Sequence, residues 1–302
     1  MTIRAAGTID PVLLGRRKTR AAALSIASNA TLIVLKVIAG VITGSIAIIT
    51  EAVHSGIDLM ASVIAYFSVR KAEAPADHEH PYGHAKVENL AAAFEGVLVL
   101  VGAGIIVFES VRRLADVPEV ESLGFGIGVI AFSGVANVIV STYLYREARV
   151  TQSPALEGDA AHLRTDAMTS FGVLIGLVLV QATGQEVLDP VAALLVAGAI
   201  IGTGVRIVSR SSRVLVDETL PEFELEAVRE VIEGHGAEEI EGFHKLRARR
   251  AGSRRYVDMH VQFRTGTTLE RAHELAHELQ GGIRTRLHDA DVLIHLEPSR
   301  RE

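Results

Sequence analysis

Long apolar runs, separated by short polar segments, make up the chain as far as Val216, and a different pattern follows. A helix that crosses a bilayer needs roughly 20 mostly apolar residues. Six stretches reach that length, and we expect six transmembrane helices: Ala21–Gly44, Ser45–Val69, His84–Val111, Leu123–Tyr145, Ala155–Thr183 and Val187–Val208. The pattern therefore predicts an all-α membrane domain.

The fifth stretch has the weakest apolar signal. Only "SFGVLIGLVLVQATG" is strongly apolar, and so short a run is also compatible with a re-entrant or buried segment. We extend this helix back to Ala155 because Pro154 is suited to opening a helix. Its charged first half would then face the interior of the bundle.

From Pro221 onward the pattern is that of a small soluble domain. "FELEAVREVIEGHG" and "LERAHELAHELQGGIRTRL" are typical of amphipathic helices. "GFHKLRARRAGSRRYVDMHVQF" predicts two strands around a turn, and "DVLIHLEP" predicts a closing strand. The order α-β-β-α-β predicts an α+β domain in which helices cover one face of a small sheet.

The distribution of basic residues predicts the orientation. The clusters "RRKTR", "VRK", "YREAR" and "RIVSRSSR" fall on one side of the expected spans, and only Arg112 and Arg113 fall on the other. Because cytoplasmic loops are enriched in Lys and Arg, both termini are placed in the cytoplasm. The expected organisation is an N-terminal cytoplasmic segment (1–20), a membrane transport domain (21–213) and a cytoplasmic domain (214–302).

Composition narrows the chemistry. Hydrophobic residues make up 49% of the 302 positions, which fits a chain embedded in lipid. There is no cysteine, so disulfides and thiolate sites are excluded and a metal would need His, Asp, Glu or backbone oxygens. A formal net charge of −6 gives no reason to expect a nucleic-acid partner.

Two of the apolar stretches carry the same polar pair. His54 precedes Asp58 by four residues, and His162 precedes Asp166 by four. On a helix such residues share a face, with Cβ atoms about 6 Å apart, so two facing pairs could hold a zinc-like ion tetrahedrally. Two unrelated polar pairs in interhelical hydrogen bonds are the alternative. The repeated spacing favours the metal, because a carboxylate at the bilayer centre costs about 3 kcal/mol and usually marks a pathway.

Two further acidic residues have two possible roles each. Glu51 and Asp159 lie one turn from these pairs and could serve as entry groups or outer partners of a metal, or simply as interhelical hydrogen-bond groups. Zinc is the first choice for two imidazoles and two carboxylates, with cobalt, nickel, iron, manganese or cadmium still possible.

The loop after the second stretch, "APADHEHPYGHAKVENLAA", is rich in histidine. Asp77, His80 and His84 are spaced to converge on a second ion, with His78 as a spare, although a solvated loop is an equal alternative.

The "HELAH" segment, residues 273 to 277, matches the H-E-x-x-H pattern of zinc proteases, with Glu274 as base. Such an enzyme also needs a third ligand and an open cleft, which a small α-β-β-α-β domain is unsuited to enclose. We therefore do not expect an enzyme.

With both HxxxD pairs, the loop and the tail, the sequence from Arg17 to Pro298 resembles the cation diffusion facilitator family of metal exporters. The resemblance implies a homodimeric, multi-pass antiporter of the bacterial inner membrane that exchanges divalent metal for protons. Zinc would be both substrate and regulator, without a further cofactor, and the tail would have a ferredoxin-like fold.

The resemblance also assigns roles to residues. It implies a transport site formed by His54, Asp58, His162 and Asp166, and a loop site formed by Asp77, His80 and His84. It implies a cytoplasmic site near the dimer interface, formed by His244, His260, His273, His295 and Glu297. A charge interlock between Lys86 and Asp217 would hold the membrane halves of the dimer together.

Three positions depart from the common bacterial pattern. Histidine at position 54, where aspartate is frequent, resembles the zinc-preferring members. Glu297 stands in place of an aspartate and Leu296 in place of a polar residue, which leaves the number of ions in the cytoplasmic site open.

The residues themselves indicate how metal and protons are coupled. Histidine binds metal only when it is neutral, so metal must displace any proton on His54 or His162. Because imidazole exchanges protons near the pH of the cytoplasm, one site could load metal on one side of the membrane and protons on the other.

Overall fold

The computed structural model describes residues 11–43, 46–115, 124–185, 187–235, 238–287 and 289–299. The chain divides into two compact units, one of residues Pro11–Ser212 and one that begins at Arg213. Each unit is described separately below.

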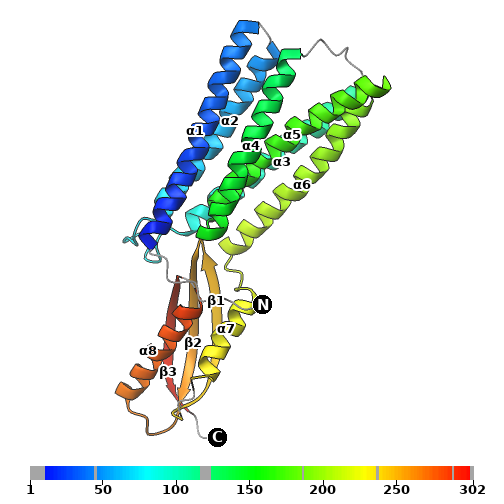
Figure 1. Ribbon diagram of the computed structural model, residues 1–302. Helices are drawn as coiled ribbons and strands as arrows, with labels where there is room; N and C mark the ends of the chain where they lie inside the picture. Colours follow the sequence, from blue (N-terminus) through cyan, green and yellow to red (C-terminus); the bar gives the residue numbers. More distant parts are fainter. Residues whose placement is uncertain are drawn as a thin grey trace. The chain divides into compact units, whose positions relative to one another are not determined.

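The first unit is a bundle of long helices (Figure 1). Its described part contains α1 (Pro11–Thr43), α2 (Ile46–Ala72), α3 (Lys86–Ala115), α4 (Gly124–Thr151), α5 (Pro154–Thr183) and α6 (Leu188–Leu215). They follow the order of the six expected stretches. The first begins at Pro11 rather than Ala21, so the expected N-terminal segment overlaps the helix, and residues 1–10 lie outside the described residues.

Four helices of the described part are long and apolar enough to cross a membrane: Leu13–Ala39, Lys86–Leu114, Pro154–Thr183 and Leu188–Leu215. Large apolar side chains are exposed on the outer surface of the bundle, among them Ile42, Phe108 and Leu195. Exposed apolar surface on this scale indicates contact with lipid. A count of six spans stays a prediction.

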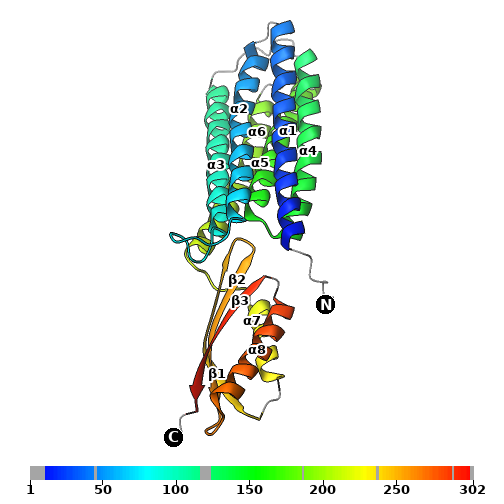
Figure 2. The same cartoon turned by 90° about the vertical axis from the view of Figure 1, so that its left-hand side faces the viewer.

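Helix α5 lies at the centre of the bundle and packs against α1, α2, α3 and α4 (Figure 2). Small side chains make this close packing possible: Ala155 and Ala160 of α5 are fully buried beside Leu144 of α4. In membranes such small residues let helix backbones approach one another. The stretch with the weakest apolar signal therefore contacts four other helices.

The ends of α5 follow from its local sequence. Ser153 is the N-cap, its hydroxyl accepts the backbone N–H of Leu156 at 3.3 Å, and Pro154 occupies the first turn. Gly184 ends the helix with a left-handed φ of 68°, which glycine adopts without steric cost. The helix is thus continuous over Pro154–Thr183, in agreement with the expected extension back to Ala155.

The second unit has the expected α-β-β-α-β order: α7 (Glu222–Glu233), β1 (Ile240–Ala251), β2 (Arg254–Phe263), α8 (Leu269–Arg286) and β3 (Ala290–Pro298). β2 is the central strand, antiparallel to β1 and parallel to β3. Both helices lie on one side of the sheet (Figure 2).

Alternation along β2 separates the two faces of this sheet. Val257, Met259 and Val261 are buried in one core with Leu275 and Leu279 of α8. Because successive side chains of a strand point to opposite faces, His260 lies on the face away from the helices.

A buried ionic cluster braces the same unit. The carboxylate of Glu224 on α7 accepts hydrogen bonds from Arg255 at 2.8 and 2.9 Å and from Arg250 at 2.8 Å. Burial raises the pKa of Glu224, but the hydrogen bonds and charges of the two arginines outweigh it and hold the pKa below its ordinary value.

Candidate metal centres

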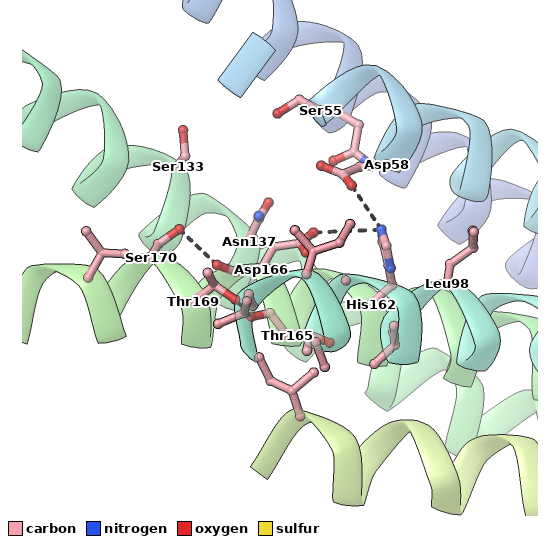
Figure 3. A pocket seen from close by; sticks show the side chains of 18 of the residues that line it. Ser55, Asp58, Leu98, Ser133, Asn137, His162, Thr165, Asp166, Thr169 and Ser170 are labelled. Atoms are coloured by element: carbon pink, nitrogen blue, oxygen red, sulfur yellow. Dashed lines mark hydrogen bonds and ion pairs between the residues drawn. The ribbon is translucent and has the colours of Figure 1, made fainter. Parts of the chain in front are cut away.

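Inside the bundle, Asp58 of α2 meets His162 and Asp166 of α5 (Figure 3). The Nε2 atom of His162 lies 3.1 Å from Oδ1 of Asp58 and 3.9 Å from Oδ2 of Asp166. The candidate ligand atoms of all three lie within 4.8 Å of one another. We call these three residues the bundle trio.

The bundle trio forms because residue spacing on one helix is combined with packing between two helices. The four-residue spacing puts His162 and Asp166 on one face of α5, and α2 packs directly against α5. Asp58 and His162 are buried, with 7% and 6% of their surface exposed. Two acids and one imidazole in so dry a place need a cation or protons to balance their charge.

A cavity of about 290 Å³ opens beside the trio. It is lined by Asn29, Lys36, Ser55, Asn137 and Thr169 together with apolar side chains of α3 and α4. Figure 3 shows Asp58, His162 and Asp166 at its wall. The cavity offers space in which a hydrated ion could approach the three ligands.

The fourth expected ligand, His54, stands one turn before Asp58 on α2. Its side chain and that of Glu51 lie outside the described residues. The structure therefore brings together three of the four residues that were predicted from the doubled HxxxD spacing, and the role of His54 stays a prediction.

The cavity also contains a cation that the sequence reasoning missed. Lys36 of α1 is buried, and its Nζ donates a hydrogen bond to Ser55 at 2.7 Å. A lysine in the middle of an apolar stretch was the available signal, since charges inside membranes are rare and usually functional.

Asp159 lies one turn before His162 and is fully buried. One of its oxygens accepts a hydrogen bond from Ser62 at 2.9 Å, and Ser62 in turn accepts one from Asn29 at 2.8 Å. Of the two roles left open for Asp159, these contacts show interhelical hydrogen bonding.

The loop residues Asp77, His80 and His84 also converge, with ligand atoms within 4.8 Å. Oδ2 of Asp77 lies 3.2 Å from Nε2 of His84, and its Oδ1 lies 3.3 Å from Nδ1 of His80. The backbone N–H of His80 also donates to Asp77 at 2.7 Å and lowers the pKa of that carboxyl. The loop is thus folded around its carboxylate, and His84 is buried.

In the second unit, strand register aligns three histidines. His244 pairs with His260, and His260 pairs with His295, across the three strands. Glu297 joins them: it lies 2.6 Å from Nδ1 of His260 and 2.8 Å from Nε2 of His244. These two hydrogen bonds, that of His260 first, lower the pKa of Glu297. We call His244, His260 and Glu297 the sheet trio.

His295 adjoins the sheet trio, with its Nε2 atom 3.7 Å from Oε1 of Glu297 and its ring centroid 4.6 Å from that of His260. His273 does not join it within one chain. Its Nε2 atom lies 3.1 Å from that of His277 on α8, and α8 covers the opposite face of the sheet.

His273 and His277 are also the two histidines of the H-E-x-x-H pattern. Among the described residues, no group of three candidate ligands contains His273 or His277. The third ligand that a zinc protease needs is thus not found there.

Asp217 has a left-handed φ of 61°, and both its oxygens accept hydrogen bonds from Nη1 of Arg249 at 3.0 Å. Lys86 is the first residue of α3. Since these residues belong to different units, the interlock between them stays a prediction.

Two family models match the chain. The cation efflux transmembrane domain matches residues 22–216, and the cation efflux protein cytoplasmic domain matches residues 220–299. The chain belongs to the cation diffusion facilitator family of metal efflux transporters. The match identifies it as a membrane protein, and the second model, a dimerisation domain, indicates a homodimer.

Individual relatives agree over most of the chain. The transporter sll1263 of Synechocystis sp. is 32% identical over 277 residues, which is 92% of this chain and 89% of the relative. The cation-efflux pump FieF of Salmonella paratyphi A is 30% identical over 284 residues, which is 94% of each. A solved structure of CzrB in its Zn form is 34% identical and covers 28% of this chain and 99% of its own, with a TM-score of 0.24.

Proposed function

We propose that this transporter exports a divalent metal ion, zinc foremost, from the bacterial cytoplasm in exchange for protons. The observation that carries the proposal is the bundle trio, an imidazole between two carboxylates beside a cavity in the membrane unit. The proposal places six helices in the inner membrane and both termini in the cytoplasm, because basic clusters follow the second, fourth and sixth helices.

The ligands favour a borderline metal. Imidazole nitrogen and carboxylate oxygen suit zinc, and with His54 as a fourth ligand the set would complete a tetrahedron. Cobalt, nickel, iron, manganese and cadmium accept similar ligands, and geometry decides among them. Zinc is preferred because two histidines among four ligands favour it over harder ions such as manganese.

Proton exchange follows from the ligand chemistry. Metal binds the imidazole of His162 only in its neutral form, and imidazole changes its protonation near neutral pH. The inward-facing site would release protons as it loads metal. The outward-facing site would release metal as it regains protons. No covalent bond changes, so the protein is a transporter rather than an enzyme.

The sheet trio supports a regulatory role for the second unit. It is solvent-accessible, and His295 lies beside it as a further ligand. Metal bound there would favour one arrangement of the two subunits and shift the population of transport states by its differential affinity.

The test is transport by the purified protein in liposomes that contain a zinc-sensitive dye, with an imposed pH gradient. Asp58→Asn and Asp166→Asn are expected to abolish zinc uptake. Glu109→Gln is the control, since this acid lies on the bundle surface paired with Arg113. Wild-type uptake by either trio variant would refute the assigned site.

The same liposomes separate the remaining alternatives. Uptake that rises with an opposing proton gradient indicates an antiporter, and uptake that ignores the gradient indicates a channel. Competition among zinc, cobalt, iron, manganese and cadmium ranks the substrates. Casein cleavage tests the protease pattern, and we expect none.

A further inference from the structure

Helix α8 carries two exposed histidines side by side. The Nε2 atoms of His273 and His277 lie only 3.1 Å apart, and their ring centroids lie 4.4 Å apart. The family resemblance gave a role to His273 and none to His277. Neither belongs to a group of three candidate ligands among the described residues, so their close approach requires its own explanation. We call these two residues the helix pair.

The sequence of α8 places the helix pair on its outer face. Other residues of the helix, Leu275 and Leu279 among them, are buried in the core of the second unit, whereas His273 and His277 are exposed. A spacing of four residues then stacks the two imidazoles on successive turns. Because the core anchors the inner face of α8, the helix holds the pair in place without a metal.

The separation of the two nitrogens suits a zinc-like ion. Zinc bonds imidazole nitrogen at about 2.0–2.1 Å, so two such ligands of a tetrahedral ion lie about 3.3 Å apart. The observed 3.1 Å is close to this value. Without metal, one ring donates its Nε2–H to the Nε2 of the other. Both rings can bind metal through Nε2 and stay neutral once the donor ring carries its proton on Nδ1.

The surrounding charge and the ligand type favour such an ion as well. Glu270, in the first turn of α8, is exposed and lies three residues before His273, so its charge attracts a cation to the neighbouring turn. Glu274 lies between the two histidines in sequence but pairs with Arg271 at 3.2 Å. Imidazole suits zinc, copper and nickel, whereas manganese and magnesium prefer oxygen ligands. Water can supply the remaining ligands at this exposed surface.

We propose that the helix pair is a second metal site of this unit, a two-histidine chelate for a zinc-like divalent ion, separate from the sheet trio. Helix α8 covers the face of the sheet opposite to His260 (Figure 2). The sheet trio adds the carboxylate of Glu297 to two imidazoles, so the helix pair binds zinc more weakly and fills after it. The second unit then responds to metal over a wider range of concentration than one site permits.

Zinc binding to the full chain tests the proposal. Calorimetry uses a background of Asp58→Asn, Asp77→Asn and His260→Ala, which impairs the bundle trio, the loop group and the sheet trio. In this background, His273→Ala and His277→Ala are each expected to weaken the remaining zinc binding at least about tenfold. Both histidines are exposed and alanine is the best helix former, so α8 should stay helical, which circular dichroism checks.

A histidine moved by one turn provides the matched control. Gly281 is exposed, and a Cβ atom there would meet no atom within 4 Å, so the helix accommodates Gly281→His. Added to His273→Ala, this change rebuilds the four-residue spacing with His277 and should restore the zinc affinity to within about threefold. Added to His277→Ala, it leaves two histidines about 12 Å apart along the helix axis and should restore nothing.

Three results would overturn the proposal. Loss of zinc binding in His273→Ala but not in His277→Ala would mean that His273 binds metal with other residues. No zinc binding in the background, or equal binding with and without the pair, would leave only a hydrogen bond between two rings. Failure of Gly281→His to restore binding in a folded His273→Ala chain would exclude a chelate on one helix. Because the measurement is binding, a lack of proton exchange in the liposomes would refute the proposed antiport alone.

Discussion

The bundle trio and the sheet trio use the same chemical groups in opposite surroundings. In the bundle, the side chains of Asp58 and His162 are 10% and 8% exposed, whereas in the sheet those of His244 and Glu297 are 42% and 26% exposed. Helix packing assembles the first trio and strand register assembles the second. The same ligand types can therefore lie in a dry or a solvated place, so ligand identity alone does not determine the role of a candidate metal site.

The surroundings of each trio determine how strongly its charges destabilise the protein when no ion is bound. Water screens the charges of the sheet trio, so these residues tolerate the absence of an ion, which the proposed sensor role requires. The bundle trio has little water, so protons or a metal must balance its acids at all times. This requirement is consistent with the proposed exchange of metal for protons.

The largest expected effect tests the buried trio. Asp58→Asn removes a charged ligand that lies 3.1 Å from His162. We expect the rate of zinc transport to fall by at least about 100-fold, since even outer partners of metal ligands are worth 10- to 100-fold. Stopped-flow dye uptake in liposomes measures it. A fall of less than tenfold in the transport rate would mean that the buried trio is not essential for transport.

A buried acid in the second unit tests whether burial, rather than location in the helix bundle, makes a charged side chain important. Glu224→Gln leaves Arg255 and Arg250 without their carboxylate. The free energy of unfolding of this unit should fall by about 3 kcal/mol or more. Hydrogen exchange of β2 measures it, with Glu222→Gln, an exposed acid on the same helix paired with Arg229, as control. Equal effects of the two variants would contradict the comparison.

The same ion pair predicts a pH dependence. The folded-state pKa of Glu224 is lowered from its ordinary 4.5. Its contribution to stability is therefore complete above pH 4.5 and is lost as the pH falls through the folded-state value. Protection of β2 against hydrogen exchange should drop below pH 4.5 in the wild type. The drop should be smaller in Glu224→Gln, and an unchanged drop would exclude Glu224 as its cause.

A moderate effect is expected from the exposed trio. His260→Ala removes the central ligand of the sheet row, so the second unit should bind zinc at least about tenfold more weakly. Calorimetry on the full chain in a background of Asp58→Asn and Asp77→Asn, which impairs both the bundle trio and the loop group, isolates this site. His235→Ala, whose histidine pairs with Glu278 away from the row, is the control. A tenfold loss of zinc affinity in a folded variant supports a solvent-screened site that the fold does not require. Unfolding of the second unit in His260→Ala would contradict this interpretation.

The smallest effect concerns the interlock predicted from the family resemblance. Asp217 already pairs with Arg249, and 46% of its side chain is exposed. Exposed ion pairs contribute about 0.2–1 kcal/mol, so a double-mutant cycle of Lys86→Ala and Asp217→Ala should give a coupling energy in that range. The stability of the dimer in detergent provides the measurement. A coupling energy of zero would contradict the predicted interlock between Lys86 and Asp217.

Much of the architecture was accessible from the pattern of apolar residues. Helix order in the bundle and the α-β-β-α-β order of the second unit follow from periods of 3.6 and 2 residues. Helix α1 begins at Pro11, before the expected span at Ala21, and Lys18 within "GRRKTR" is buried against Glu88. A basic residue in a helix is no sign of exposure once a buried acid pairs with it.

The candidate sites divide in the same way. The four-residue spacing was enough to predict that His162 and Asp166 share a face, because it depends only on helix geometry. The contact of Lys36 with Ser55 could not be predicted. It depends on how each helix is rotated about its own axis, and packing between distant segments sets this rotation.

Local periodicity and side-chain chemistry were enough to predict the elements, their order and the residue types that could hold a metal. Which acids lie in the dry interior, which histidines align across the sheet and which carboxyls lack a partner became known only from the folded chain. Burial and pairing arise between residues as far apart as Asp58 and His162, and local sequence carries no information about the distance between them.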